Sequence, residues 1–163
     1  MFTKTSLYSL ALARIALGWM FLWAFFDKLW GLGFATTPDK AWLAGVSPTA
    51  GFLSHAAKGP FVELFNAMSG SHVVEWLFML GLLGIGAAFV FGIATRFAGI
   101  CGALLVALMF LSLIPPTNNP LIDEHVIYFF VFIGFAFSNI GDYLGFGNWW
   151  RSTKLVSRFR FLA

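Results

Sequence analysis

Four long apolar stretches, separated by short polar or glycine-rich connections, occupy most of the 163-residue chain. None of them alternates apolar and polar positions with a period of two, so strands are not expected. A helix that crosses a bilayer needs about 20 apolar residues. The pattern therefore predicts transmembrane helices over residues 8–32, 73–93, 97–114 and 121–140, the last following Pro120.

The connection over residues 34–71 is too rich in local signals to be a plain loop. Residues 37–39 combine a capping hydroxyl, a proline suited to a first turn and an acid that the helix dipole favours. Gly59 and Pro60 begin a second short helix, whose apolar face comprises Phe61, Leu64, Phe65 and Met68. We expect short helices that lie in the membrane interface or fold back over the mouth of the bundle.

Charge is distributed unequally between the two ends of the predicted helices. Basic residues lie in three regions at one set of helix ends. They are Lys4 and Arg14 near the start of the first helix, Arg96 between the second and third, and Arg151, Lys154, Arg158 and Arg160 after the fourth. The positive-inside rule places these ends, and both termini, in the cytoplasm. The sequence thus predicts an all-α integral membrane protein, a four-transmembrane-helix bundle in the cytoplasmic membrane of a prokaryote, with short interfacial helices in the first extracytoplasmic loop.

Composition supports one membrane domain over residues 1–163. The chain is 60% hydrophobic and 10% charged, whereas soluble domains carry about 25% charged residues. The net charge of +3 comes largely from the basic tail over residues 142–163, and it indicates the orientation of the chain in the membrane rather than binding to nucleic acid. We expect the tail to lie on anionic lipid as an anchor, or to dock a partner. The lone Cys101 excludes an intrachain disulfide, a cysteine-held iron–sulfur cluster and a CxxC pair.

Ionisable residues gather at the outer ends of three predicted helices. They are Asp27, Lys28, His72, Glu75, Asp123, Glu124 and His125. Charges at membrane depth are costly, so each needs a partner or a function. Two interpretations stay open: the acids complement helix dipoles while Lys28 reaches to water, or the residues surround a ligand.

The second interpretation gives each residue a role in a pocket for a small polar ligand or a quinone head group. Lys28, Glu75, Glu124 and His125 would form its reactive wall, since a histidine–carboxylate pair relays protons to a quinone. Further lining residues would be Asp27, His72 and Asp123, with Trp42, Phe61 and Phe65 as a lid. Although His72, Glu75 and His125 are metal-ligand types, their spacing matches no metal motif, and we predict no metal.

At the inner ends, Arg14 and Asp142 are expected at similar depth and predict a structural ion pair. Glycines in the helices predict close packing, because small residues let membrane helices approach one another. These glycines are Gly18, Gly81, Gly84, Gly86, Gly92, Gly99 and Gly102.

Several segments together resemble the DoxX/DoxD family of small membrane proteins. They are RIALGWMFL from Arg14, Asp27-Lys28-Leu29, TTPDKAWLAGVSPTAGFL, the Glu75 start of the second helix, GIATR ending at Arg96, and NPLIDEHVIYFFVF from Asn119. The branch that they resemble most is the small subunit of thiosulfate:quinone oxidoreductase. The resemblance implies a four-helix bundle, oxidation of thiosulfate to tetrathionate, and transfer of the electrons to membrane quinone beside a separate DoxA-like or other redox subunit.

The leading hypothesis is thus a membrane subunit of a quinone-linked oxidoreductase, with quinone as substrate or bound acceptor and no covalent cofactor. The alternative is a non-catalytic scaffold or assembly subunit of a larger respiratory or redox complex. A third hypothesis is a lipid or small-solute carrier. The central spans show no polar path of the kind that such a carrier needs, which argues against it. The partners expected are the bilayer, membrane quinone, a redox subunit and a second copy of the chain.

Overall fold

The computed structural model describes residues 3–117, 119 and 121–162. Over these residues the chain consists of helices and turns, without strands. Three helices are long and apolar enough to cross a membrane: α1 (Lys4–Trp30), α4 (His72–Phe91) and α5 (Thr95–Ser112). The fourth apolar helix, α6 (Glu124–Ala136), has 13 residues, which is shorter than the predicted span over residues 121–140.

Local signals explain where these helices begin and end. Thr3 caps α1, so the helix starts four residues before the prediction, and Gly31 ends it in the left-handed conformation. Asp123 caps α6 through its carboxylate. Pro120, which the fourth helix is predicted to follow, lies outside the described residues. At its other end α6 gives way to a tight turn and to the 3₁₀ helix η4 (Ile140–Asp142).

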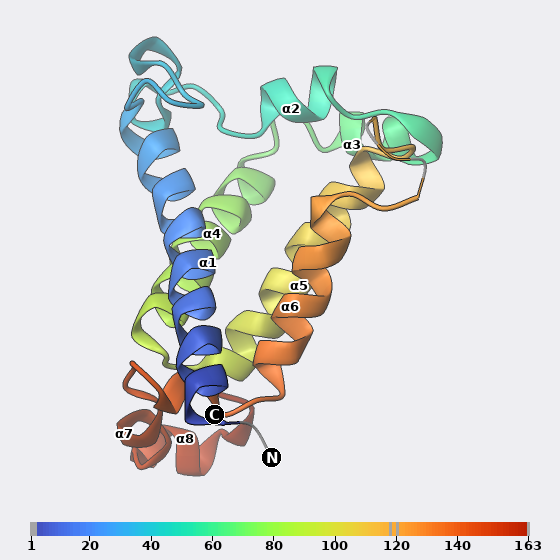
Figure 1. Cartoon of the computed structure of the whole chain (residues 1–163). Helices are drawn as coiled ribbons and strands as arrows, with labels where there is room; N and C mark the ends of the chain where they lie inside the picture. Colours follow the sequence, from blue (N-terminus) through green and yellow to red (C-terminus); the bar gives the residue numbers. More distant parts are fainter. Residues whose placement is uncertain (1–2, 118, 120, 163) are drawn as a thin grey trace.

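The long helices form two antiparallel pairs, α1 with α4 and α5 with α6 (Figure 1). Gly18 and Gly86 let the first pair touch backbone to backbone, since a Cβ on either would lie 2.7 Å from a main-chain nitrogen of the partner helix. In the second pair Gly99 and Gly102 fit against Phe132 and Ala136 of α6. Close packing is confirmed for these four glycines, whereas Gly81 and Gly84 have open space around them and the prediction is wrong there.

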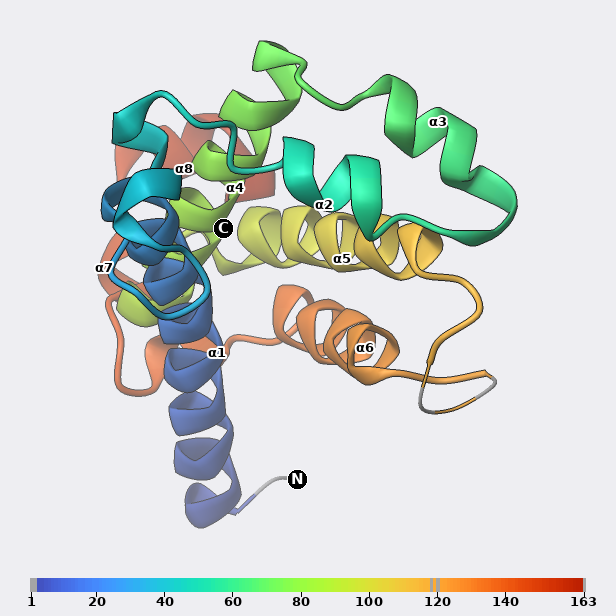
Figure 2. The same ribbon diagram turned by 90° about the horizontal axis from the view of Figure 1, so that it is seen from above.

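The two pairs meet at one end of the molecule and lean apart toward the other (Figures 1 and 2). Where they meet, the rings of Phe21 and Phe132 lie 5.2 Å apart and those of Phe89 and Phe132 lie 5.1 Å apart. Phe132 and Phe89 are completely buried. We call this the tail end, since residues 140–162 lie there, and we call the opposite end, with residues 31–71, 113–117 and 121–123, the loop end.

Short helices make up both ends. At the loop end these are η1 (Pro38–Lys40), η2 (Trp42–Ala44), α2 (Ala50–His55), η3 (Gly59–Phe61) and α3 (Val62–Ala67). At the tail end, η4 is followed by α7 (Gly147–Arg151), α8 (Lys154–Arg158) and η5 (Arg160–Leu162). The two predicted helix starts at the loop end are confirmed by η1 and η3, while α2 was not predicted.

Candidate functional site

The loop end brings ionisable side chains to three helix ends, as the sequence indicates. Asp27 and Lys28 lie in the last turn of α1, and His72 and Glu75 in the first turns of α4. Asp123, Glu124 and His125 lie at the start of α6. Their partners decide whether these groups build one site or several local structures.

Asp27 closes the turn that follows α1. Its side chain is buried, and its two carboxylate oxygens accept hydrogen bonds from the backbone N–H groups of Phe34, at 3.2 Å, and Ala35, at 3.0 Å. A buried carboxylate satisfied in this way stabilises the local backbone. Asp27 is therefore a structural residue of this turn.

Glu75 is also buried, with 5% of the residue exposed, but it pairs with a side chain at the surface. The Nδ1 atom of His72 lies 3.3 Å from its Oε2 atom, while the His72 side chain is 90% exposed. Beside them, the rings of Trp42 and Trp76 pack at 4.7 Å. Trp42 thus belongs to the surroundings of the α1–α4 pair.

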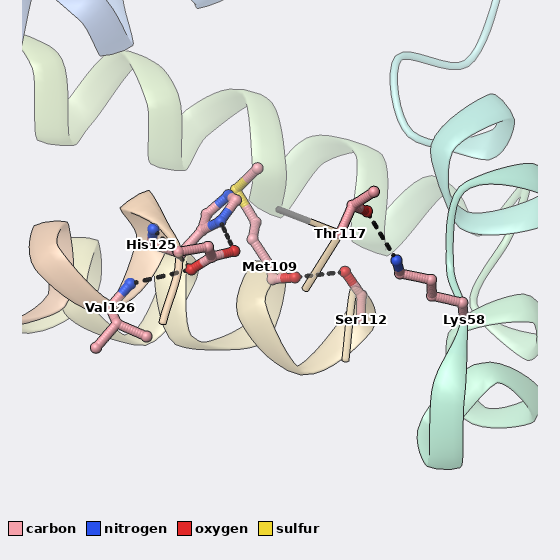
Figure 3. Close-up of polar contacts among 7 residues, drawn as sticks. Lys58, Met109, Ser112, Thr117, His125 and Val126 are labelled. Carbon is pink, nitrogen blue, oxygen red and sulfur yellow. Dashed lines mark hydrogen bonds and ion pairs between the residues drawn. The ribbon is translucent and has the colours of Figure 1, made fainter. Parts of the chain in front are cut away.

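Asp123 and His125 form a compact pair at the start of α6. Asp123 Oδ1 accepts the backbone N–H groups of His125 and Val126, while its Oδ2 lies 2.8 Å from His125 Nδ1 (Figure 3). Only 12% of the His125 side chain and 14% of the Asp123 side chain are exposed. Burial raises the pKa of Asp123, but the hydrogen bond and charge of His125 and the two backbone N–H groups outweigh it and leave the pKa below its usual value.

This pair has the geometry of an oriented proton donor and acceptor. An Nδ1–H that donates to a carboxylate leaves the other ring nitrogen, Nε2, as the atom that can exchange a proton. Among the hydrogen bonds of the described residues, none involves His125 Nε2. The sequence analysis expected a histidine–carboxylate pair, and the structure forms it with Asp123, whereas Glu124 is exposed.

The predicted pocket around Lys28, Glu75 and His125 is wrong. The loop ends of α1 and α6 lie on opposite sides of the molecule in both views (Figures 1 and 2). Over the described residues no hydrogen bond or ion pair joins any two of the three residues. The physical reason is that the helix pairs diverge, so each ionisable group has its nearest partner on its own segment.

The predicted lid does not cover His125 either. Figure 2 shows α5 lying between α6 and the α2–α3 region. Phe65 is buried within that region, Phe61 is 42% exposed, and Trp42 lies with Trp76, so the three aromatic residues do not form one lid. Sequence periodicity finds an apolar helix face, but it does not say which neighbour that face packs against.

The α2–α3 region instead contacts the end of α5 through hydrogen bonds and close packing of residues that were not predicted from the sequence. The Lys58 backbone N–H donates to the Ser112 carbonyl at 2.9 Å. The Lys58 Nζ donates to Thr117 Oγ1 at 3.0 Å (Figure 3). Gly59 lies so close to the Ile114 carbonyl that a side chain has no room there. The Gly-Pro pair at 59–60 predicted a helix start, but nothing in the neighbouring sequence indicated this contact.

Asp123, Glu124 and His125 also offer ligand atoms within 4.8 Å of one another. They are consecutive residues at one helix start, and two of them already bond to each other. The set of metal-ligand types considered from sequence, with His72 and Glu75, is not the set that the structure brings together.

At the tail end, the predicted ion pair between Arg14 and Asp142 is not formed among the described residues. Arg14 is completely buried and donates to four main-chain carbonyls: Phe89, Val90, Tyr143 and Leu144. Asp142 pairs with Arg151 instead. The end of α4 and the turn after η4 present carbonyls that lack helical partners, and the guanidinium satisfies these first.

Comparison of the chain with protein-family models, with curated proteins and with solved structures gives no match. The resemblance to the DoxX/DoxD family therefore stays a prediction.

Proposed function

We propose that the chain spans the cytoplasmic membrane of a prokaryote four times, with the tail end in the cytoplasm. Three apolar helices support the membrane location. The fourth crossing would be α6, whose 13 residues rise about 20 Å and need thinner bilayer or flanking residues to reach both surfaces. The cluster of Arg151, Lys154, Arg158 and Arg160 at the tail end supports the orientation.

We further propose that this membrane subunit serves a quinone-linked oxidoreductase of the thiosulfate:quinone type. The observation that carries the proposal is the nearly buried His125–Asp123 pair. A protonated His125 would donate from Nε2 to a quinone carbonyl, and Asp123 would stabilise the imidazolium at Nδ1. The family resemblance supplies the electron donor: two thiosulfate ions yield tetrathionate and two electrons, which with two protons convert the quinone to the hydroquinone.

The other ionisable groups at the loop end have no place in this step. Asp27 holds backbone N–H groups, and Glu75 pairs with the exposed His72 on another helix pair. We therefore assign the quinone contact to His125, positioned by Asp123, and no role in it to Lys28 or Glu75. The redox centre that passes electrons on would belong to a partner subunit.

The alternative function, a non-catalytic assembly subunit, is favoured by one specific observation. Among the described residues, the side chains of Asp27, Glu75 and Asp123 bond within their own segments, and no hydrogen bond or ion pair of these groups joins the two helix pairs. Purification in mild detergent tests this role. A chain that always co-purifies with a redox complex, and whose His125→Gln variant leaves turnover of that complex unchanged, is an assembly subunit.

The direct test is thiosulfate-dependent reduction of a soluble ubiquinone analogue by the full chain with its co-purified partners. Loss of a positioned proton donor slows turnover by about 100-fold, so His125→Gln should show such a loss and Asp123→Asn a smaller one. His72→Gln is the matched control, because that side chain is 90% exposed. Equal rates for His125→Gln and His72→Gln would defeat the assignment.

A further inference from the structure

The basic tail is a folded structure rather than a loose chain. The Nε1–H of Trp150 donates to the Leu162 carbonyl at 2.6 Å, which brings the end of the tail back to α7. The Phe161 ring packs 5.9 Å from the Phe97 ring of α5. Val156 of α8 is 4% exposed. The tail therefore docks on the tail end of the bundle and holds its side chains in fixed positions.

This docking creates a basic concavity of about 400 Å³ lined by Arg151, Val156, Ser157 and Arg160. One guanidinium nitrogen of Arg151 is held by Asp142 and Asn148, which orients the side chain. Arg160 is exposed and has no hydrogen-bond partner among the described residues. Two guanidinium groups beside a hydroxyl are suited to a phosphate, because guanidinium groups bind phosphate oxygens in pairs.

An apolar concavity also borders α7. It is lined by Phe146 and Trp149, whose exposed fractions are 59% and 62%. Exposed aromatic rings next to basic residues are typical of a membrane–water boundary. Arg151, which lines the basic concavity, follows Trp149 by two residues in the same short helix, so the two side chains leave α7 on different sides. A basic concavity close to a membrane–water boundary suits a ligand with an anionic head and an apolar body.

We propose that the tail binds the phosphodiester head group of an anionic phospholipid between Arg151 and Arg160, at the membrane–water boundary that Phe146 and Trp149 mark. Ser157 donates its hydroxyl hydrogen to the Lys154 carbonyl at 2.8 Å, so it contributes shape rather than a donor. This site rests on the membrane location of the chain and is independent of the redox proposal.

The test compares single charge removals within the same tail. Native mass spectrometry of the full chain in detergent micelles measures binding of phosphatidylglycerol, phosphatidylcholine and inorganic phosphate. A basic group near an anionic surface contributes about 1 kcal/mol, or about fivefold in affinity, so Arg160→Gln should weaken phosphatidylglycerol binding at least that much. Arg158→Gln is the matched control, because Arg158 lies over the Phe159 ring and does not line the concavity.

Three outcomes decide the matter. A loss confined to Arg160→Gln, with weak binding of phosphatidylcholine, supports the site. Equal losses in Arg160→Gln and Arg158→Gln would mean diffuse attraction and would overturn it. Binding of inorganic phosphate as tight as that of phosphatidylglycerol would overturn the lipid as the natural ligand.

Discussion

The tail end and the loop end of the helix bundle hold their polar side chains in different ways. At the tail end Arg14 bonds to carbonyls 75 to 130 residues away in the chain. At the loop end the pairs formed by Asp27, His72 and Asp123 join residues at most eight positions apart. Arg14 thus joins distant segments at the tail end, whereas the charged side chains at the ends of α1, α4 and α6 bond within their own segments. The Lys58 side chain, which donates to Thr117, is a contact between distant segments at the loop end.

This difference follows the shape of the bundle. Where the helix pairs meet, a buried guanidinium reaches carbonyls from α4 and from the turn after η4, and the Phe132 cluster fills the space between the helices. Where the pairs diverge, no side chain of the described residues joins α1 to α6 through a hydrogen bond or ion pair. Charged residues at the same depth therefore do not necessarily form one site.

The largest effect should come from Arg14. Arg14→Ala leaves four carbonyls without their donor, and unsatisfied buried groups cost about 1–3 kcal/mol each, so we expect at least about 3 kcal/mol less unfolding free energy in mixed detergent micelles. The stability of Arg14→Lys should lie between those of the wild type and Arg14→Ala, because an ammonium group donates from one nitrogen whereas a guanidinium group donates from several. An Arg14→Ala variant as stable as the wild type would break the comparison between the ends.

A smaller effect is expected where α1 and α4 touch. Gly86→Ala places a Cβ 2.7 Å from the Leu22 nitrogen, and such overpacking costs about 1–3 kcal/mol. Gly84→Ala on the same helix is the matched control, because that position has open space. Thermal unfolding followed by circular dichroism should separate the two variants, and equal stabilities would show that the helices do not touch there.

The smallest of the three effects belongs to the loop end. Asp123→Ala removes the α6 cap and the bond to His125, and we expect a loss of about 1 kcal/mol, whereas the exposed Glu124→Gln should change little. Since the folded-state pKa of Asp123 lies below its usual value, its contribution is present at neutral pH and is lost as the pH falls through that folded-state pKa. Unfolding curves at neutral and acid pH check this, and a pH-independent difference would contradict it.

Much of the fold was predictable because its signals are local. The apolar runs predict α1, α4 and α5 to within a few residues, since length and composition alone identify such helices. Gly59, which with Pro60 predicts the start of a short helix, begins η3 with a positive φ value. The helix α6 is shorter than its apolar run, because hydrophobicity continues past Ala136 while the backbone turns into η4.

The candidate site was predictable only in part. The sequence predicts a histidine–carboxylate pair among Glu75, Glu124 and His125, whereas the structure pairs His125 with Asp123, which was expected only to line the pocket. Three other predictions depended on the angles between separate helices, which the sequence does not give. They are the pocket with Lys28 and Glu75, the aromatic lid and the Arg14–Asp142 pair. The hydrogen bond from Lys58 to Thr117, which lies 59 positions away, could not be predicted from the sequence of either segment.

The sequence by itself determined the helical character of the chain, its apolar spans and the opposite charge of its two ends, because hydrophobic runs, caps and charge patterns act over neighbouring residues. Only the tertiary structure decided which polar groups meet, since that depends on glycine contacts that draw α1 onto α4 and α5 onto α6, and on the angle at which the two pairs part. Those distances between segments place Arg14 among carbonyls and leave His125 with Asp123 alone.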